Sequence, residues 1–370
     1  MKKIEKIFPK IAMGISFLCV LFAISFIVFP VKYENTVAAS QIDAINVSKT
    51  EKIEVVSPQS KSLIPLGRTT GIKLFSQGTM VIGFAADHAV KTPAEAAGLK
   101  IGDVVTEANG AAITSNEDFV KALSQATQPE IQLKILRGNQ KLSLTVKGER
   151  DDSAGYKIGA WVRDSLAGIG TITYVDPENG AFGALGHGVC DEETGTLMPI
   201  GGGSIMRSAV VDVKKGQSGA PGELVGEYDL VNDQGILYSN TGSGIFGCLQ
   251  DKKLYDQSQA VPVASKNEIK EGKAQIIANV ENDKTEVYDI EILKLYSDDD
   301  GTGRNMMIRV TDEKLIQKTG GIVQGMSGSP ILQNGKLIGA VTHVLVNDPT
   351  RGYGIFIENM LDTAQSISKK

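Results

Sequence analysis

Residues 325–344 read GMSGSPILQNGKLIGAVTHV, and this stretch decides the class of fold that we expect for the second half of the chain. Two apolar runs flank Asn334-Gly335, and Asn-Gly between apolar runs is the strongest short signal for a β-hairpin. A glycine-rich strand and a short helix follow in GYGIFIENMLDTA, residues 352–364. From residue 154 onward, short apolar runs are broken by glycine turns in the same way, which predicts a closed all-β structure such as a barrel or a sandwich.

Two segments share the pattern G-x-S-G-x-P, at residues 216–221 and 325–330. Glycines around a serine let the backbone turn tightly, expose the hydroxyl and direct successive amide N–H groups at one point. We predict that Ser327 is a nucleophile and that the N–H groups of Gly325 and Ser327 form an oxyanion hole. Ser218, followed by Pro-Gly-Glu, is interpreted as a turn serine.

A serine nucleophile needs a base within hydrogen-bond reach, and the chain has three histidines, His88, His187 and His343. His187 lies in GALGHG, at the end of an apolar strand, where glycines leave the imidazole accessible; this suits a general base. It precedes Ser327 by 140 residues, which is enough to place the two on separate barrels. His343 follows on a strand, where we expect a core or sheet-face imidazole.

The stretch from residue 67 to residue 147 predicts a small α+β unit. Its centre has the spacing A-x-x-A-G-L-x-x-G-D-x-V-x-x-x-N-G, with a turn at Asn109-Gly110. This combination resembles the signature of PDZ domains, which bind peptides by strand addition. Four residues, Gly71, Ile72, Lys73 and Leu74, stand where that family has its carboxylate-binding loop and edge strand, and the alternative is an ordinary strand.

Residues 11–29 are uncharged and follow four lysines, which predicts a membrane-inserting helix. A retained anchor is favoured over a cleaved signal peptide with a cut near residues 37–40, because signal h-regions are usually shorter. The basic flank stays cytoplasmic, so the rest of the chain is expected outside the cytoplasm. The predicted division of the chain is a basic N-terminus at 1–10, an anchor at 11–31, a stalk at 32–64, a PDZ-like domain at 65–150 and a serine peptidase domain at 151–370.

Charge and cysteine content exclude other classes of function. The net charge is −5 and no long block of Lys and Arg occurs, so no nucleic-acid partner is expected. Three cysteines at irregular spacing predict neither a disulfide framework nor a metal site, and we expect no cofactor. Cys190, near His187, is a competing nucleophile, but packing or pairing with Cys248 is the favoured interpretation.

The run after Ser327 resembles the C-terminal barrel of chymotrypsin-like serine proteases, which implies a double β-barrel in a mainly β chain. The order of anchor, PDZ-like domain, GALGHG, KKGQSGAPGE and GMSGSP resembles the stage IV sporulation protein B peptidases, membrane-tethered serine proteases of spore-forming bacteria. That resemblance implies a triad of His187, Asp312 and Ser327, although in chymotrypsin-like folds the acid lies far upstream of the nucleophile. Asp289 and Asp212 are the fallback acids.

The same resemblance implies a role in sporulation signalling, in the space between the two forespore membranes. The protease would cleave itself and a membrane-bound regulator, so that an intramembrane protease can process a late sigma factor precursor, while the PDZ-like domain captures a peptide. Two alternatives remain open. One is a non-catalytic membrane-tethered PDZ scaffold, and the other is a general envelope-stress protease, in which the order of protease and PDZ domain is usually the reverse.

Overall fold

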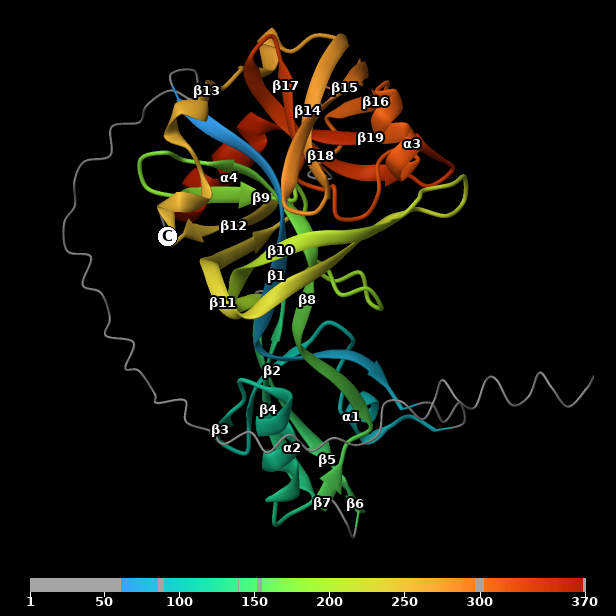
Figure 1. Cartoon of the computed structure of the whole chain (residues 1–370). Coiled ribbons are helices and arrows are strands. Elements are labelled where there is room, and N and C mark those ends of the chain that lie inside the picture. Colours follow the sequence, from blue (N-terminus) through green and yellow to red (C-terminus); the bar gives the residue numbers. More distant parts are fainter. Residues whose placement is uncertain (1–60, 86–89, 139, 152–154, 297–302, 369–370) are drawn as a thin grey trace, which may run out of the picture. The chain divides into compact units, whose positions relative to one another are not determined.

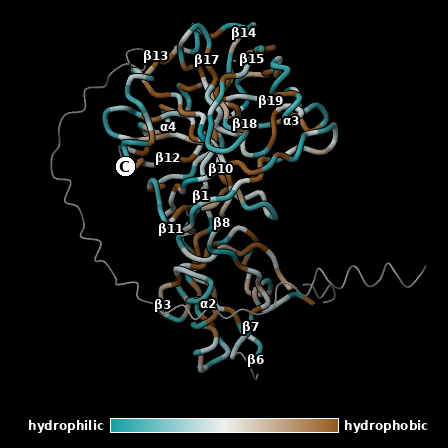
Figure 2. Tube along the Cα trace, in the orientation of Figure 1, coloured by the Kyte–Doolittle hydropathy of each residue, from teal (hydrophilic) through white to brown (hydrophobic). Residues whose placement is uncertain are grey.

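The computed structural model describes residues 61–85, 90–138, 140–151, 155–296 and 303–368, and these residues fold mainly into β-strands (Figure 1). Hydrophilic and hydrophobic residues alternate along many strands (Figure 2), as in Glu130–Arg137, because successive side chains of a strand point to opposite faces. No helix within these ranges is long and apolar enough to cross a membrane. The predicted anchor, the stalk up to residue 60 and His88 lie outside the described residues.

Six strands form a ring that we call the first barrel. Each pairs antiparallel with the next, and the last returns to the first. In ring order they are β1 (Ser62–Phe84), β8 (Ala160–Val175), β9 (Ala181–Ala184), β12 (Gly244–Leu249), β11 (Glu223–Thr241) and β10 (Ile200–Lys214). The short β13 (Val261–Pro262) pairs with the first residues of β1. Aliphatic side chains fill the ring, among them Ile64, Ile72, Leu74, Ile172, Ile205, Leu237 and Ile245.

The ring is complete only at one end, because β9 and β12 are short. β9 pairs with β8 from Ile172 to Val175, and β12 pairs with β11 from residue 235 to residue 241. Residues 163–169 of β8 therefore have β1 on one edge and no strand on the other edge within the described chain.

The second barrel is closed by six antiparallel strands. In ring order they are β14 (Gly272–Glu281), β15 (Lys284–Leu295), β16 (Met306–Val310), β19 (Asp348–Phe356), β18 (Lys336–Leu345) and β17 (Pro330–Gln333). Helix α3 (Glu313–Thr319) follows β16, and α4 (Ile357–Ser368) ends the described chain. Leu63 and Phe246 of the first barrel pack in one buried cluster with Leu337, Ile355 and Met360, which joins the two barrels.

A small α+β unit lies between β1 and β8 in the sequence. Its elements are α1 (Pro93–Ala96), β2 (Val104–Ala108), β3 (Ala111–Ala112), α2 (Asn116–Ser124), β4 (Glu130–Arg137), β5 (Gln140–Lys147), β6 (Glu149–Asp151) and β7 (Gly155–Lys157). Thr92 and Glu95 form a capping box at the start of α1. Asn109 and Gly110 both have positive φ between β2 and β3, as the Asn-Gly signal predicts.

Strands β1 and β8 run without a break from the first barrel into the α+β unit. Their pairing covers Thr70 to Phe75 in the barrel and resumes at Met80, after a register shift, to reach Phe84 in the α+β unit. The α+β unit is therefore inserted between two strands of a barrel. The sequence alone assigned β1 from residue 65 onward to the PDZ-like domain, whereas its first half belongs to the barrel.

This placement corrects one prediction. The segment Gly71–Leu74 pairs with β8 on one edge and with β10 on the other. A strand whose two edges are occupied has no free backbone groups with which to add a peptide. The prediction that Gly71, Ile72, Lys73 and Leu74 form a peptide-binding edge is therefore wrong, and the alternative of an ordinary strand holds.

Candidate active site

His187 lies just after β9, on a turn that brings it to the second barrel. Leu185 and Gly186 have φ of 68° and 70°, in the left-handed region. A Cβ on Gly186 would come within 2.9 Å of side-chain atoms of Ile355 and Thr342, so only glycine lets the chain pass this close to the second barrel. The turn leaves the imidazole of His187 partly buried between the two barrels.

The contacts of His187 define which nitrogen can act as a base. Its Nδ1 lies 2.9 Å from the carbonyl oxygen of Gly188. A carbonyl oxygen only accepts hydrogen bonds, so in the neutral ring the proton is on Nδ1 and the lone pair is on Nε2. Burial lowers the pKa of His187, and the bond to Gly188 offsets this effect in part. The ring is therefore neutral near pH 7, which is the state that a general base requires.

Ser327 lies on the loop between α3 and β17, held against the first barrel. The backbone N–H of Thr171 on β8 donates to the carbonyl of Ser327 at 3.1 Å, and the Thr171 hydroxyl donates to the carbonyl of Gly325 at 2.7 Å. Gly328 has a φ of 99°, and a Cβ there would fall on the carbonyl oxygen of Thr171. Since Leu185 N also donates to Thr171 O, this one threonine connects the serine loop with the turn that carries His187.

The backbone around Ser327 leaves two N–H groups available. Met326 N, Gly328 N and Ser329 N donate to backbone carbonyls. The N–H groups of Gly325 and Ser327 donate no hydrogen bond within the part of the chain that the structure describes. These are the two groups predicted to form the oxyanion hole, and their availability is what such a hole needs.

The Ser327 hydroxyl donates to the carbonyl of Thr342 at 2.7 Å, and no hydrogen bond joins it to His187. The residue after Thr342 is His343, whose ring centroid is 5.1 Å from that of His187. Burial, and then the nearby His187 and Arg304, lower the pKa of His343 to about 4. Its buried Nδ1 has no partner among the described residues.

Sequence reasoning placed His343 in a core or on a sheet face, and it did not foresee a second imidazole beside the first. The only available signal was that the strand carrying His343 follows the Ser327 motif directly.

Asp312 is not brought to His187. Its Oδ1 accepts from Leu315 N at 3.0 Å, as the N-cap of α3, and its Oδ2 accepts from Asp289 N at 3.4 Å. The fallback acids are equally separate, because Asp289 accepts from the Gln275 side chain and Asp212 from Val213 N. Within the described ranges, neither His187 nor His343 makes a hydrogen bond or ion pair with a carboxylate.

The second glycine-serine segment supports the first. Ser218 is exposed, and its hydroxyl donates to the carbonyl of Asn347 at 2.9 Å, on a tight turn, as a turn serine would. The end of the Ser218 loop is hydrogen-bonded to the start of the Ser327 loop. Gln324 N donates to Gly222 O at 2.8 Å, and Leu224 N donates to Gln324 O at 2.9 Å.

Cys190 and Cys248 are both unpaired, so the predicted pairing between them is wrong. Cys190 lies beside His187 in an exposed position, and the partial loss of water around its thiol raises the pKa, which leaves the thiol protonated near pH 7. No glycine turn surrounds this thiol, unlike the serine of residues 325–330.

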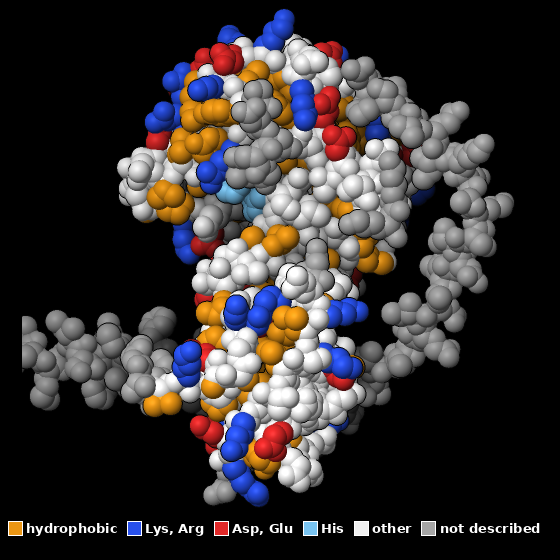
Figure 3. All heavy atoms as spheres, turned by 180° about the vertical axis from the view of Figure 1, so that it is seen from behind, with side chains coloured by type: hydrophobic (Ala, Val, Ile, Leu, Met, Phe, Trp, Pro, Cys, Tyr) orange, Lys and Arg blue, Asp and Glu red, His pale blue; other side chains and the backbone are white. Residues whose placement is uncertain are grey.

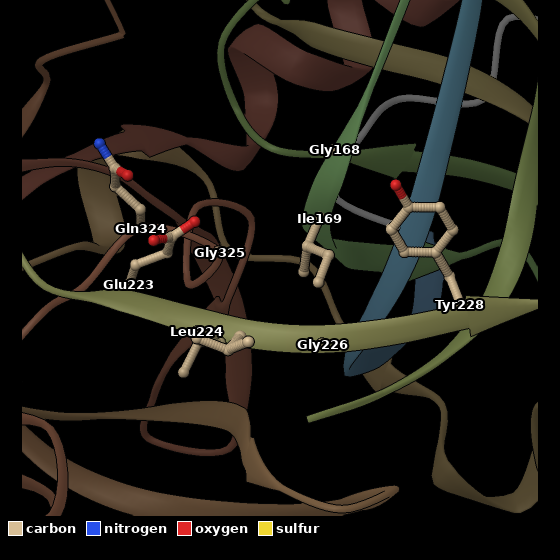
Figure 4. A pocket seen from close by; sticks show the side chains of 9 residues that line it. Gly168, Ile169, Glu223, Leu224, Gly226, Tyr228, Gln324 and Gly325 are labelled. Carbon is tan, nitrogen blue, oxygen red and sulfur yellow. The ribbon is translucent and has the colours of Figure 1, made fainter. Parts of the chain in front are cut away.

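Ser327 and His187 line the same hollow, whose volume is about 510 Å³. Figure 3 shows histidine side chains inside a hollow of the surface. The walls come from β1, β8 and the turn at His187, and include Ile72, Leu74, Leu166, Ala167, Gly168, Ile169, Leu185 and Val189. A smaller hollow of about 250 Å³ adjoins it at Ile169 and Gly325. Figure 4 shows the side chain of Ile169 there, between Tyr228 and the pair Glu223 and Gln324.

Two β-barrels that bring a glycine-flanked serine and an imidazole to one hollow fit the class of serine peptidases. The SpoIVB peptidase S55 family matches residues 154–361, and the PDZ domain family matches residues 86–147. The first match covers more than half of the chain. The chain therefore belongs to the SpoIVB peptidase S55 family, and it carries a PDZ domain.

The family assignment confirms the resemblance to the stage IV sporulation protein B peptidases. A solved PDZ domain, that of the SdrC-like protein from Listeria monocytogenes, matches with 22% identity over 23% of this chain and 87% of that chain, at a TM-score of 0.20. No curated protein matches the chain.

Proposed function

We propose that the chain is a serine endopeptidase in which Ser327 is the nucleophile and His187 the general base. The observation that carries the proposal is the junction at Thr171, which holds the Ser327 loop of one barrel against the His187 turn of the other. Both residues then face one hollow. In that hollow the N–H groups of Gly325 and Ser327 have no other partner within the described chain.

Catalysis by this pair requires the Ser327 hydroxyl to change its partner. The Ser327 hydroxyl leaves the carbonyl of Thr342 by rotation about its Cα–Cβ bond and turns toward Nε2 of His187. It then attacks the carbonyl carbon of the peptide bond while Nε2 takes its proton, and the oxyanion is held by the N–H groups of Gly325 and Ser327. His187 returns the proton to the leaving amine, and water releases the acyl group by the same route.

The third member of the triad is open to test. Family resemblance assigns it to Asp312, whose carboxylate here caps α3. The carbonyl of Gly188 already accepts from Nδ1 of His187, which is the contact that a triad acid would otherwise provide. The contacts therefore support a working pair of Ser327 and His187, with Asp312 as a positioning residue for α3.

We further propose that the protein acts outside the cytoplasm, held by an N-terminal anchor, in sporulation signalling. Its substrates would be its own chain and a membrane-bound regulator whose cleavage lets an intramembrane protease process a late sigma factor precursor. The uncharged segment at 11–29 and membership of the SpoIVB peptidase S55 family support this part of the proposal. The PDZ domain would capture a peptide of a protein partner.

The test is the reaction of the full chain with a fluorophosphonate probe, read by intact mass. We expect labelling of the wild type and of Ser218→Ala, and no labelling of Ser327→Ala or His187→Ala. Labelling that disappears only in Ser218→Ala would contradict the assignment.

A second candidate, a PDZ scaffold without catalysis, is favoured by one contact, the bond from the Ser327 hydroxyl to Thr342. That candidate predicts a folded wild type that never labels. A general envelope-stress protease would instead label and would cleave unfolded proteins without selection.

A further inference from the structure

The unpaired edge of β8 borders the hollow that contains Ser327 and His187. Residues 166–169 of β8 pair with Leu74 to Gly71 of β1 on one edge, and all four line the hollow. Thr171, which holds the carbonyls of Gly325 and Ser327, comes two residues after Ile169 on the same strand. A peptide that paired with this edge would thus run directly toward the nucleophile.

The backbone of this edge is accessible. Ala167 and Gly168 are exposed, and neither carries a side chain large enough to cover the strand. A Cβ built on Gly168 would have no atom within 4 Å, although this glycine lines both hollows. Because a Cβ points away from the plane of the sheet, this open space lies over the face of the strand, where a side chain of a peptide paired with the edge could lie.

The side chains that line the larger hollow are mostly aliphatic. Apart from His187, its ionisable side chains are Arg163, Glu192 and the protonated thiol of Cys190. The Arg163 guanidinium is already paired with Asp191 and with Glu193, so it is not a free cation for an acidic substrate. A hollow of about 510 Å³ is within the usual range for binding pockets, and burial of a charged side chain in it would be unfavourable.

We propose that the substrate binds as an extended strand along the free edge of β8, residues 166–169, and places an aliphatic side chain in the hollow beside Ser327. This rests on the proposed serine endopeptidase and names its substrate class: a segment with Leu, Ile or Val close to the scissile bond. Strand pairing provides affinity that does not depend on sequence, and the hollow provides the selectivity. We expect peptides with Asp at that position to have a kcat/KM on the order of 100-fold lower.

Gly168→Val tests the geometry, with Gly202→Val on β10 as the matched control. Neither glycine has a positive φ, and a Cβ on either has no atom within 4 Å, so both variants are expected to fold. Gly202 lies outside both hollows. One sample of each full chain is labelled with the fluorophosphonate probe, and a separate, unlabelled sample is given a mixture of decapeptides, whose cleavage sites are read by mass spectrometry.

We expect all three proteins to label at Ser327, the wild type and Gly202→Val to cleave next to aliphatic residues, and Gly168→Val to cleave at least 10-fold more slowly. Methylation of alternate backbone nitrogens of a good peptide should lower its cleavage, as strand pairing requires. A wild type that labels with the probe but whose unlabelled sample cleaves without aliphatic preference or cleaves nothing, or a Gly168→Val variant that cleaves at the control rate, overturns this inference alone. A wild type that never labels overturns the proposed function and this inference with it.

Discussion

Replacement of Asp312 by asparagine and by alanine distinguishes two possible roles of this residue, that of a helix cap and that of a catalytic acid. The Asp312 carboxylate accepts from Leu315 N and from Asp289 N, and it makes no contact with His187. Asparagine caps a helix about as well as aspartate, while alanine at an N-cap costs about 1 kcal/mol, with a range of about 0.5–2. We therefore expect Asp312→Asn to unfold with nearly the wild-type free energy, and Asp312→Ala to lose about 1 kcal/mol.

The catalytic role predicts a different magnitude. In a Ser-His-Asp triad, exchange of the acid for its amide lowers kcat by about 10⁴-fold, equal to about 5.5 kcal/mol, because the histidine takes the wrong tautomer. In this structure the carbonyl of Gly188 already selects the tautomer of His187. We expect the labelling rate of Asp312→Asn to stay within a few-fold of wild type.

The assay combines urea unfolding with the rate of fluorophosphonate labelling, measured on wild type and on both variants. Asp289→Asn is the matched control, because that carboxylate is exposed and, among the described residues, accepts only from the side chain of Gln275. A fall of about 10⁴-fold in Asp312→Asn at unchanged unfolding free energy would refute the reasoning. Asp312 would then be the triad acid, and the start of α3 would have to move in the active enzyme.

Three further predictions concern the junction and the imidazoles. Thr171→Val keeps the shape but removes the bond to the Gly325 carbonyl, so we expect a loss of about 1–3 kcal/mol and slower labelling; an unchanged rate would show that the bond does not position Ser327. The labelling rate should fall on acidification with a midpoint below 6.5, because burial lowers the pKa of His187 and only the neutral ring is a base; a midpoint above 6.5 would contradict this. The pKa of His343 is lowered to about 4, so the unfolded chain binds more protons between pH 6.5 and 4, and stability is lost as the pH falls through that window. His343→Gln should flatten this dependence by up to about 3 kcal/mol in urea unfolding, and an unchanged slope would refute it.

The local parts of the site could be predicted from the sequence. Gly325 and Gly328 predict a tight turn with an exposed serine, and both have positive φ in the structure. The glycine before His187 likewise has a positive φ, but the imidazole that was predicted to be accessible is partly buried. Each of these turns depends on a few adjacent residues, and backbone sterics alone determine the result.

The long-range parts could not be predicted. The alternation in residues 62–75 shows that a strand is present but not which strands pair with it, and its partners lie about a hundred residues away in β8 and β10. Likewise, Asp312 stands 15 residues before Ser327 in the sequence, and spacing of that kind does not reveal that its oxygens cap α3. His343 reaches the site because β18 runs beside the Ser327 loop, which is again a matter of tertiary packing.

The shared strands also decide how the chain can be cut. A truncation at the predicted boundary near residue 151 would remove β1, one of the six strands of the first barrel. The buried side chains of Ile64, Ile72 and Leu74 would be lost with it. Their burial contributes about 1.5–3 kcal/mol each, which is comparable with the whole stability of about 5–15 kcal/mol of a typical domain. Phe75 and Ser165 face each other across β1 and β8, so a peptidase without its PDZ domain is better made by excision of the segment between them and closure with a two-residue hairpin. Loss of activity in a simple truncation would then report a broken barrel and would say nothing about the PDZ domain.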